Sequence, residues 1–231
     1  MLNVLFVILF LHSLIHLEAG IVIELAKSDA SLEIKKDKIS LYKKNNVLCD
    51  SIVFYHKEIK SIALSMDSTK LFLVVGAKNK FYGDALKIYV IKDNKLNYLG
   101  DYINHGQNPW KVRIGDLNND GRNEVVVGVW KKVRLEKRFR KRLFIYTINK
   151  EGLKPIWLSS LLSSPFYDFE IWDIDNDKRD DVITLELQKN GLKRICVYSI
   201  CSFGLKFMKI LQKDVNLLNL ESINFQKEYK K

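Results

Sequence analysis

The protein has 231 residues, a formal net charge of +11 at neutral pH, and a hydrophobic content of 47% with 11% aromatic residues. This composition is that of a globular protein and, with only three prolines, excludes a chain of long disordered linkers. The length is sufficient for one substantial core or for an array of repeats that shares one. The positive charge favours an acidic partner or surface but does not identify it.

The chain begins with an apolar segment. Residues 1–19 contain no lysine or arginine and end in the small residue Ala19. This pattern predicts a secretory signal peptide that is cleaved after Ala19, because the segment is short for a membrane span. An uncleaved N-terminal anchor and a buried core strand are the alternatives. We therefore expect a secreted or cell-surface protein whose mature domain is 20–231.

Strand-like segments recur along the rest of the chain at intervals of 50 to 60 residues. The segments 86–92, 142–148 and 194–200 share an apolar pattern around Tyr89, Tyr146 and Tyr198, which are 57 and 52 residues apart. A repeat of this length holds about four strands, as in one blade of a propeller. The sequence therefore predicts an all-β fold, a small β-propeller of about four four-stranded blades.

The two ends of the chain predict one shared blade. Residues 21–27 have the pattern of a second strand, and residues 38–48 have that of a third and fourth. Residues 215–225 have the pattern of a first strand with no repeat of their own. We expect this C-terminal strand to complete the first blade and to cover its exposed edge. A separate edge strand or a frayed tail is the alternative.

An acidic loop follows the strand pattern that begins at Val112. Oxygen-bearing side chains occupy positions 1, 3, 5 and 9 of the loop: Asp116, Asn118, Asp120 and Glu124. Ca²⁺ takes about six to eight oxygens, and the loop supplies most of them if the carbonyl of Arg122 contributes. An EF-hand is excluded because position 12 is Val127, within a strand-like apolar run.

A second acidic loop has the same spacing. Its side-chain oxygens come from Asp173, Asp175, Asp177 and Asp181, with the carbonyl of Arg179 in place of that of Arg122. Lys178 replaces the turn glycine, so we expect a non-glycine residue at positive φ. The corresponding turn of the preceding repeat, residues 65–69, lacks this set of oxygens, and we expect no metal there.

The pattern D-x-[DN]-x-D-G-x-x-[DE], repeated between short strands, resembles the FG-GAP/VCBS repeats of integrin-type β-propellers. The resemblance implies that each loop joins the first two strands of a blade and binds Ca²⁺. It implies the ligand residues Asp116, Asn118, Asp120, Arg122, Glu124, Asp173, Asp175, Asp177, Arg179 and Asp181. Members of this family are mostly binding or scaffold modules, so the resemblance implies no reaction.

A strongly basic segment lies between two predicted strands at residues 131–142. One acid, Glu136, stands among eight cations: Lys131, Lys132, Arg134, Lys137, Arg138, Arg140, Lys141 and Arg142. This segment predicts a hairpin that binds a protein partner or a polyanion such as a wall polymer, an acidic polysaccharide or anionic lipid. Nucleic acid ranks last because of the predicted export. A solvated hairpin that only keeps the protein soluble is the alternative.

The remaining sequence gives little support for catalysis. It contains no G-x-S-x-G elbow and no H-E-x-x-H motif, and carboxylates that bind calcium stay ionised. The three cysteines have no metal or redox spacing. Of the four tryptophans, Trp110 is the one predicted to contact a ligand, and the others are expected to pack between strands. We expect a non-enzymatic binding module stabilised by calcium; a carbohydrate-active hydrolase or lyase on the same fold is the alternative.

Overall fold

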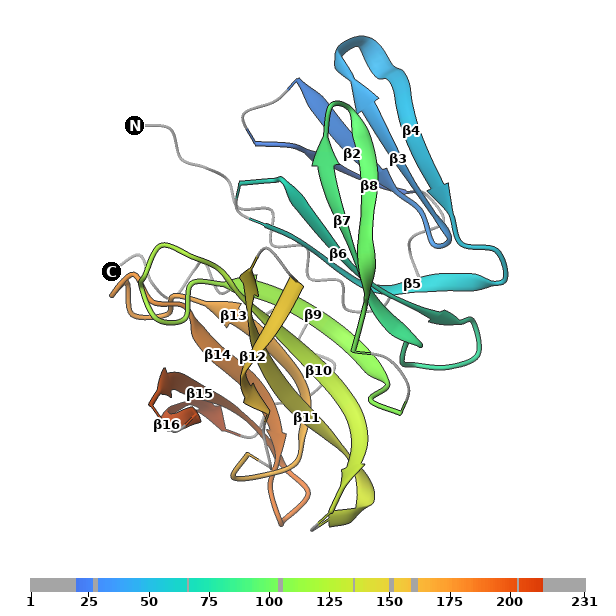
Figure 1. Ribbon diagram of the computed structural model, residues 1–231. Coiled ribbons are helices and arrows are strands. Elements are labelled where there is room, and N and C mark those ends of the chain that lie inside the picture. The colour runs from blue at the N-terminus through green and yellow to red at the C-terminus, as the bar shows by residue number, and fades with distance from the viewer. Residues whose placement is uncertain are drawn as a thin grey trace. The chain divides into compact units, whose positions relative to one another are not determined.

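The computed structural model describes residues 20–213, except 27–28, 66, 104–105, 135, 150–151, 159–161 and 203 (Figure 1). The described residues form four four-stranded antiparallel sheets, as the sequence predicts. The chain divides into two compact units, residues 1–111 and 112–231. Within the described part, no helix has the length and apolar character needed to cross a membrane.

The first unit contains two sheets whose strands follow one another in chain order. The first sheet consists of β1 (Ile21–Glu24), β2 (Ala30–Ile34), β3 (Lys38–Lys43) and β4 (Val47–Val53), with a short 3-10 turn at Lys44–Asn46. The second consists of β5 (Lys57–Leu64), β6 (Lys70–Ala77), β7 (Ala85–Lys92) and β8 (Lys95–Tyr102).

The two sheets of the first unit share one core. Leu32, Ile34, Ile39 and Leu41 of the first sheet are buried, and they belong to the same hydrophobic cluster as residues of β5 and β6. Most of the apolar residues of β2 and β6 are leucine, isoleucine, valine or phenylalanine, which pack well on a pleated surface. These two sheets therefore stabilise each other as packed layers.

The structure corrects the prediction for the first blade. Residues 21–24 form the first strand of their sheet, and residues 30–34 form the second. The position expected for the C-terminal strand is thus filled by β1. Five residues suffice for β2 because alternate side chains are buried. Residues 215–225 and the predicted signal peptide lie outside the described residues.

The second unit contains most of the third sheet and all of the fourth. The third sheet consists of β9 (Pro109–Gly115), β10 (Glu124–Val133), β11 (Glu136–Asn149) and β12 (Gly152–Leu158). The fourth consists of β13 (Phe166–Trp172), β14 (Asp181–Leu187), β15 (Lys193–Cys201) and β16 (Gly204–Lys213). The acidic loops thus join the first two strands of each sheet.

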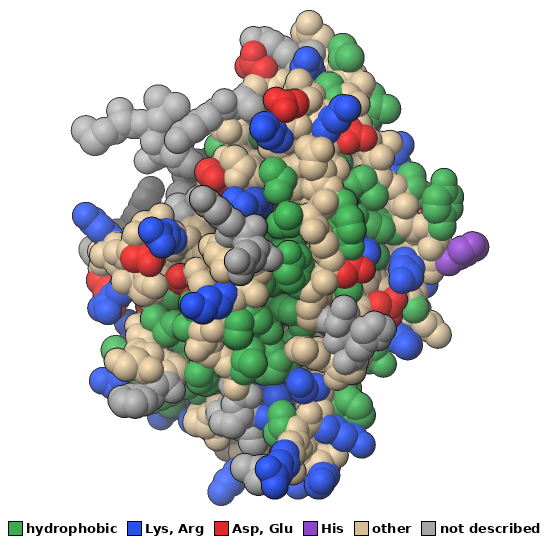
Figure 2. All heavy atoms as spheres, viewed as in Figure 1, with side chains coloured by type: hydrophobic (Ala, Val, Ile, Leu, Met, Phe, Trp, Pro, Cys, Tyr) green, Lys and Arg blue, Asp and Glu red, His purple; other side chains and the backbone are tan. Residues whose placement is uncertain are grey.

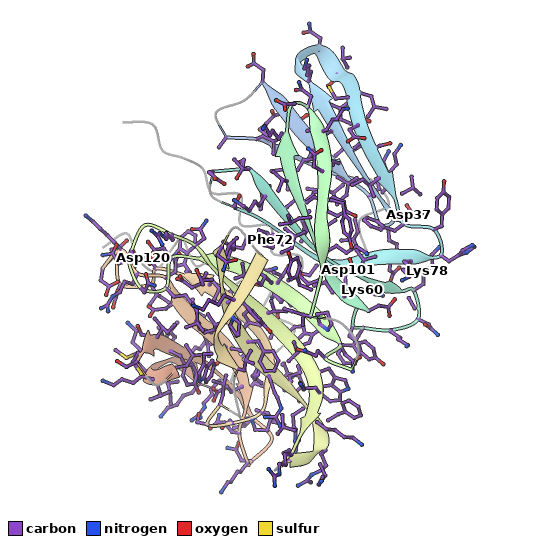
Figure 3. All side chains as sticks on the ribbon, viewed as in Figure 1. Asp37, Lys60, Phe72, Lys78, Asp101 and Asp120 are labelled. Carbon is purple, nitrogen blue, oxygen red and sulfur yellow. The ribbon has the colours of Figure 1, made fainter. Side chains whose placement is uncertain are left out.

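The β10–β11 hairpin is the longest pairing in the second unit. The apolar run 125–129 is buried on both faces of the sheet, as expected for an inner strand. The pairing then continues beyond the buried part to Val133 and Glu136, with an irregularity between Lys131 and Val133. The basic segment therefore forms the end of this hairpin. One end of β10 carries the acidic loop with Asp120, and the other carries the basic end (Figures 1 and 3).

Candidate functional site

The second acidic loop brings three carboxylates together. Oxygen atoms of Asp173, Asp175 and Asp177 lie within 4.8 Å of one another. Ligands of Ca²⁺ lie about 2.3–2.6 Å from the ion, so two ligands on opposite sides of it are separated by about 5 Å. The triad can therefore converge on one cation. Among the described residues this is the one such group, and it is exposed.

Backbone amides hold the second loop in shape. The amide of Asp177 donates to Oδ1 of Asp173 (3.1 Å) and to Oδ1 of Asp175 (3.3 Å). The amide of Lys178 donates to Oδ2 of Asp173 (2.9 Å), and that of Arg179 to Oδ1 of Asp177 (2.8 Å). These bonds orient the carboxylates before any cation arrives, because each of the three side chains already accepts at least one hydrogen bond from the main chain.

The first acidic loop has the same bonds at the same positions. The amide of Asp120 donates to Oδ1 of Asp116 (3.2 Å) and to Oδ1 of Asn118 (2.9 Å). The amide of Gly121 donates to Oδ2 of Asp116 (2.9 Å), and that of Arg122 to Oδ1 of Asp120 (2.8 Å). Four matched hydrogen bonds show that the loops adopt one conformation.

Position 6 of each loop lies in the left-handed region. Gly121 has φ 77°, and Lys178 has φ 71°, so the prediction of positive φ at Lys178 is confirmed. Glycine adopts this conformation without a steric penalty, whereas a lysine is strained there. The second loop therefore adopts the same turn as the first, although it has a lysine in place of the glycine that favours this conformation.

The last acid of each loop is buried. Oε2 of Glu124 accepts a hydrogen bond from the amide of Leu117 (2.9 Å), and burial raises the pKa of Glu124 to about 7. Asp181 occupies the same position in the second loop, and burial followed by repulsion from Asp175 and Asp177 raises its pKa to about 6. A cation between these carboxylates would relieve the repulsion.

The side chain of Arg179, at position 7 of the second loop, forms an ion pair within that loop. Arg179 donates to Oδ2 of Asp177 through Nε (3.0 Å) and Nη2 (2.7 Å), which lowers the pKa of Asp177. The sequence assigned Arg179 only a carbonyl ligand and did not indicate this ion pair. A cation that uses Oδ2 of Asp177 has to share it with the guanidinium.

The two loops are in direct contact through Asp180, which sequence reasoning missed. The amide of Asp180 donates to the carbonyl of Asp116, and Oδ2 of Asp180 accepts from the amide of Asp116, both at 2.8 Å. A side chain at Gly115 would meet Ile171 at 2.4 Å and Asp180 at 2.6 Å. The close approach of the loops therefore requires glycine at position 115. No local pattern indicates this contact, because it joins residues 64 positions apart.

The corresponding turn of the first unit is closed by hydrogen bonds. Oδ1 of Asp67 accepts from Oγ of Ser65 (2.5 Å) and from the amide of Thr69 (3.1 Å), and its Oδ2 accepts from Oγ1 of Thr69 (2.8 Å). These donors hold the turn with a single carboxylate. The absence of a metal from this turn stays a prediction.

The basic hairpin presents most of its charges to solvent. Figure 2 shows lysine and arginine side chains gathered at the lower end of the view, where Figure 1 places the hairpin end of β10 and β11. Oε1 of Glu136 accepts from the amide (3.0 Å) and Nε (3.4 Å) of Arg138, which lowers the pKa of Glu136. The exposed cations are Lys132, Arg134, Lys137 and Arg138, and Lys131, Arg140 and Lys141 are half-buried.

Two predicted ligand-binding residues lie in the interior. Arg142 is 1% exposed, its Nε donates to the carbonyl of Lys131 at 3.5 Å, and neither Nη atom has a hydrogen-bond partner. Trp110 is 9% exposed. Arg142 therefore does not lie on the exposed surface of the hairpin, and Trp110, in β9, is not exposed as expected for a residue that contacts a ligand. A run of charges predicts that Arg142 is exposed to solvent. Arg142 is instead buried, because it pairs across the two strands with Val129, which lies in the core.

A buried polar cluster in the fourth sheet was also missed. The carboxylate of Glu186 is fully buried and accepts hydrogen bonds from Arg194 (2.9 and 3.2 Å), from Thr184 (3.2 Å) and from the hydroxyl of Tyr198. These donors satisfy the hydrogen-bonding capacity of the buried carboxylate. It is suited to fixing the sheet, because its oxygens already have partners.

Comparisons with known proteins show similarity in fold alone. No protein-family model matches the sequence, and no curated protein is significantly similar to it. The WD40 domain of Neurospora crassa Pan2 is 6% identical, with a TM-score of 0.49 over 84% of this chain and 51% of that one. A 6-phosphogluconolactonase candidate from Bacteroides fragilis is 12% identical, with a TM-score of 0.52 over 82% of this chain and 53% of that one.

The chain therefore spans about half the length of these two structures. The resemblance to FG-GAP/VCBS repeats stays a prediction, since the comparisons identify no family. Four four-stranded antiparallel sheets, together with the likeness to the second structure, show that the chain has a β-propeller fold.

Proposed function

We propose that this chain is a non-enzymatic β-propeller binding module, secreted or at the cell surface, that calcium stabilises and that binds a polyanion through its basic hairpin. The observation that carries the calcium assignment is the match between the two acidic loops. Four hydrogen bonds from main-chain amides recur at the same positions, including the one that the amide of the strained Lys178 donates. A loop retained in this shape despite strain favours a role for the shape itself.

The chemistry of the oxygens favours a hard cation. Each loop offers carboxylates or an amide oxygen at positions 1, 3 and 5, and a buried acid at position 9. Oxygen-only sets of this kind suit Ca²⁺, which accepts flexible geometry, better than Zn²⁺, which prefers nitrogen and sulfur. When bound, the ion would neutralise the repelling carboxylates and tie the beginning of β10 or β14 to the loop.

The charge of the hairpin favours a polyanion as the bound partner. Eight cations and one acid lie in 12 residues, and most of the cations are exposed or half-buried. A field of one sign attracts ligands of the opposite sign and speeds their association. Wall polymers, acidic polysaccharides and anionic surfaces share this chemistry, as does an acidic protein.

Calorimetric titration with Ca²⁺ tests the metal assignment. We expect two sites per chain in the wild type and one in Asp177→Asn, because the substitution removes a ligand from the second loop. Asp93→Asn is the matched control, since Asp93 is an exposed residue of the β7–β8 turn. Absence of calcium binding at millimolar concentration, or unchanged stoichiometry in Asp177→Asn, would contradict the proposal.

The alternative of a carbohydrate-active enzyme is separated by a turnover assay. Purified protein is incubated with acidic glycans, and reducing ends and unsaturated products are measured. We expect no product above that of the heat-denatured protein. Turnover that a single substitution outside the acidic loops abolishes would favour the enzyme.

A further inference from the structure

Aromatic rings and lysines alternate along one face of the basic hairpin. Trp130 and Phe139 stack with centroids 5.9 Å apart and an interplanar angle of 14°, and Nζ of Lys132 lies 4.9 Å from the centroid of Phe139. Trp130 pairs with Lys141 across the two strands, so both side chains point to the same face of the sheet. Phe139 precedes Lys141 by two residues and shares that face.

This face leads to the fourth sheet. Nζ of Lys141 donates a hydrogen bond to the carbonyl of Tyr167 in β13. Tyr167 is 42% exposed, and Nζ of Lys193, at the beginning of β15, lies 4.8 Å from the centroid of its ring. Lysines from two adjacent sheets therefore meet at Tyr167. We call this continuous set the aromatic–lysine cluster: Trp130, Lys132, Phe139, Lys141, Tyr167 and Lys193.

We propose that the aromatic–lysine cluster extends the binding surface of the hairpin onto the fourth sheet, and that the surface binds an acidic polysaccharide. This inference rests on the proposed function of the hairpin and adds Tyr167, Lys193 and the class of ligand. A hairpin alone contacts a short segment of a polymer. A surface that crosses two sheets contacts a longer one, and each further cation adds to the attraction.

The rings of the cluster position cations. An ammonium group above an aromatic face is attracted to the ring, by roughly 0.5–1 kcal/mol at exposed sites. Lys132 and Lys193 are each held this way, and Lys141 is held by the carbonyl of Tyr167. Side chains fixed before binding lose less conformational entropy when the ligand arrives. The cluster is thus a pre-organised row of positive charges.

The occupied rings favour a polysaccharide over a nucleic acid. Proteins that bind single-stranded nucleic acid stack its bases on open aromatic faces. Here Phe139 contacts Trp130 and Lys132, and Tyr167 contacts Lys193. The cluster then recognises its ligand through the charges of its lysines, and a chain of sulfated or carboxylated sugars supplies the opposite charges. The predicted export of the protein places it among such polymers.

Fluorescence anisotropy with labelled heparin oligosaccharide tests the inference. The variants are Lys193→Gln and Tyr167→Leu in the fourth sheet, Lys141→Gln, and the double variant Lys137→Gln/Arg138→Gln at the tip of the hairpin. Lys206→Gln is the matched control, because Lys206 is an exposed lysine near the β15–β16 turn, at the opposite end of β15 from Lys193.

We expect Lys193→Gln and Lys141→Gln each to weaken heparin binding roughly two- to fivefold, as for the loss of one exposed charge pair. Each should also lower the slope of log affinity against log salt by about one. Tyr167→Leu should weaken binding less, because Lys193 keeps its charge and loses only its anchor. Lys206→Gln should bind as the wild type does.

The possible outcomes separate the inference from the proposed function. If the hairpin double variant binds weakly while Lys193→Gln binds like Lys206→Gln, the ligand stays on the hairpin and the extension to the fourth sheet is wrong. If no variant differs from the wild type, the hairpin proposal fails as well. If duplex DNA or single-stranded RNA binds more tightly than heparin at the same salt concentration, the class of ligand is wrong.

Discussion

Asp180 should link the stability of the two acidic loops. The change Asp180→Ala removes the acceptor for the amide of Asp116, which Oδ2 of Asp180 reaches at 2.8 Å. An amide that loses a charged acceptor loses about 1.5–3 kcal/mol of favourable interaction. Burial desolvates the carboxylate of Asp180, which raises its pKa and offsets part of the favourable energy of this hydrogen bond in the wild type. Some compensation by water is expected because Asp180 is half-buried.

The net loss should be about 1–2 kcal/mol of unfolding free energy. For a domain of this size, 1 kcal/mol corresponds to about 2–4 °C in melting temperature. We therefore expect Asp180→Ala to melt about 2–8 °C below the wild type in the presence of a chelator, which removes any effect of bound metal. Asp180→Asn is the matched variant. It keeps an acceptor oxygen in place and should lose less than half as much.

The comparison of the two variants isolates the hydrogen bond. Both remove the negative charge, and only Asp180→Ala removes the acceptor. If both melt with the wild type, the contact between the loops contributes nothing to stability. If both lose the same amount, the charge rather than the hydrogen bond carries the effect, and the reasoning is refuted.

Three further predictions concern strain and buried charge. Lys178→Gly should raise the unfolding free energy by about 0.5–1 kcal/mol in urea melts with chelator, because relief of strain at positive φ exceeds the extra chain entropy of glycine; a decrease would contradict this. Arg142→Met should leave the melting temperature unchanged or raise it, since the guanidinium is buried without partners for its Nη atoms. Arg113→Met should lower it, because Glu170 loses hydrogen bonds of 2.6 and 3.1 Å. Equal losses in the two arginine variants would show that Arg142 has a stabilising partner.

The sequence was sufficient for the features that depend on local patterns. Apolar β-branched runs such as 125–129 predict inner strands, and they lie there. The spacing of Asp173, Asp175 and Asp177 predicts a shared site because alternate residues of a tight loop converge on its inner side. The loss of glycine at Lys178 predicts positive φ because the ligand spacing fixes the turn.

Features that depend on tertiary contacts could not be read from the sequence. The sequence does not indicate the short strand β2, because five residues give a weak alternation, and it therefore predicts a C-terminal strand at the position in the first sheet that β1 fills. The contact of Asp180 with Asp116 joins two loops that only the fold brings together. The charged segment around Arg142 predicts that this residue is exposed, but it is buried because its strand partner Val129 lies in the core.

Thermal melting with and without calcium tests the central claim most directly. A ligand present at a hundredfold excess over its dissociation constant stabilises the native state by about 2.7 kcal/mol. We expect the wild type to melt several degrees higher with Ca²⁺ than with chelator, and the double variant Asp120→Asn/Asp177→Asn to melt at the same temperature in both. Wild-type melting temperatures that coincide with and without Ca²⁺ would contradict a stabilising role for calcium in this propeller.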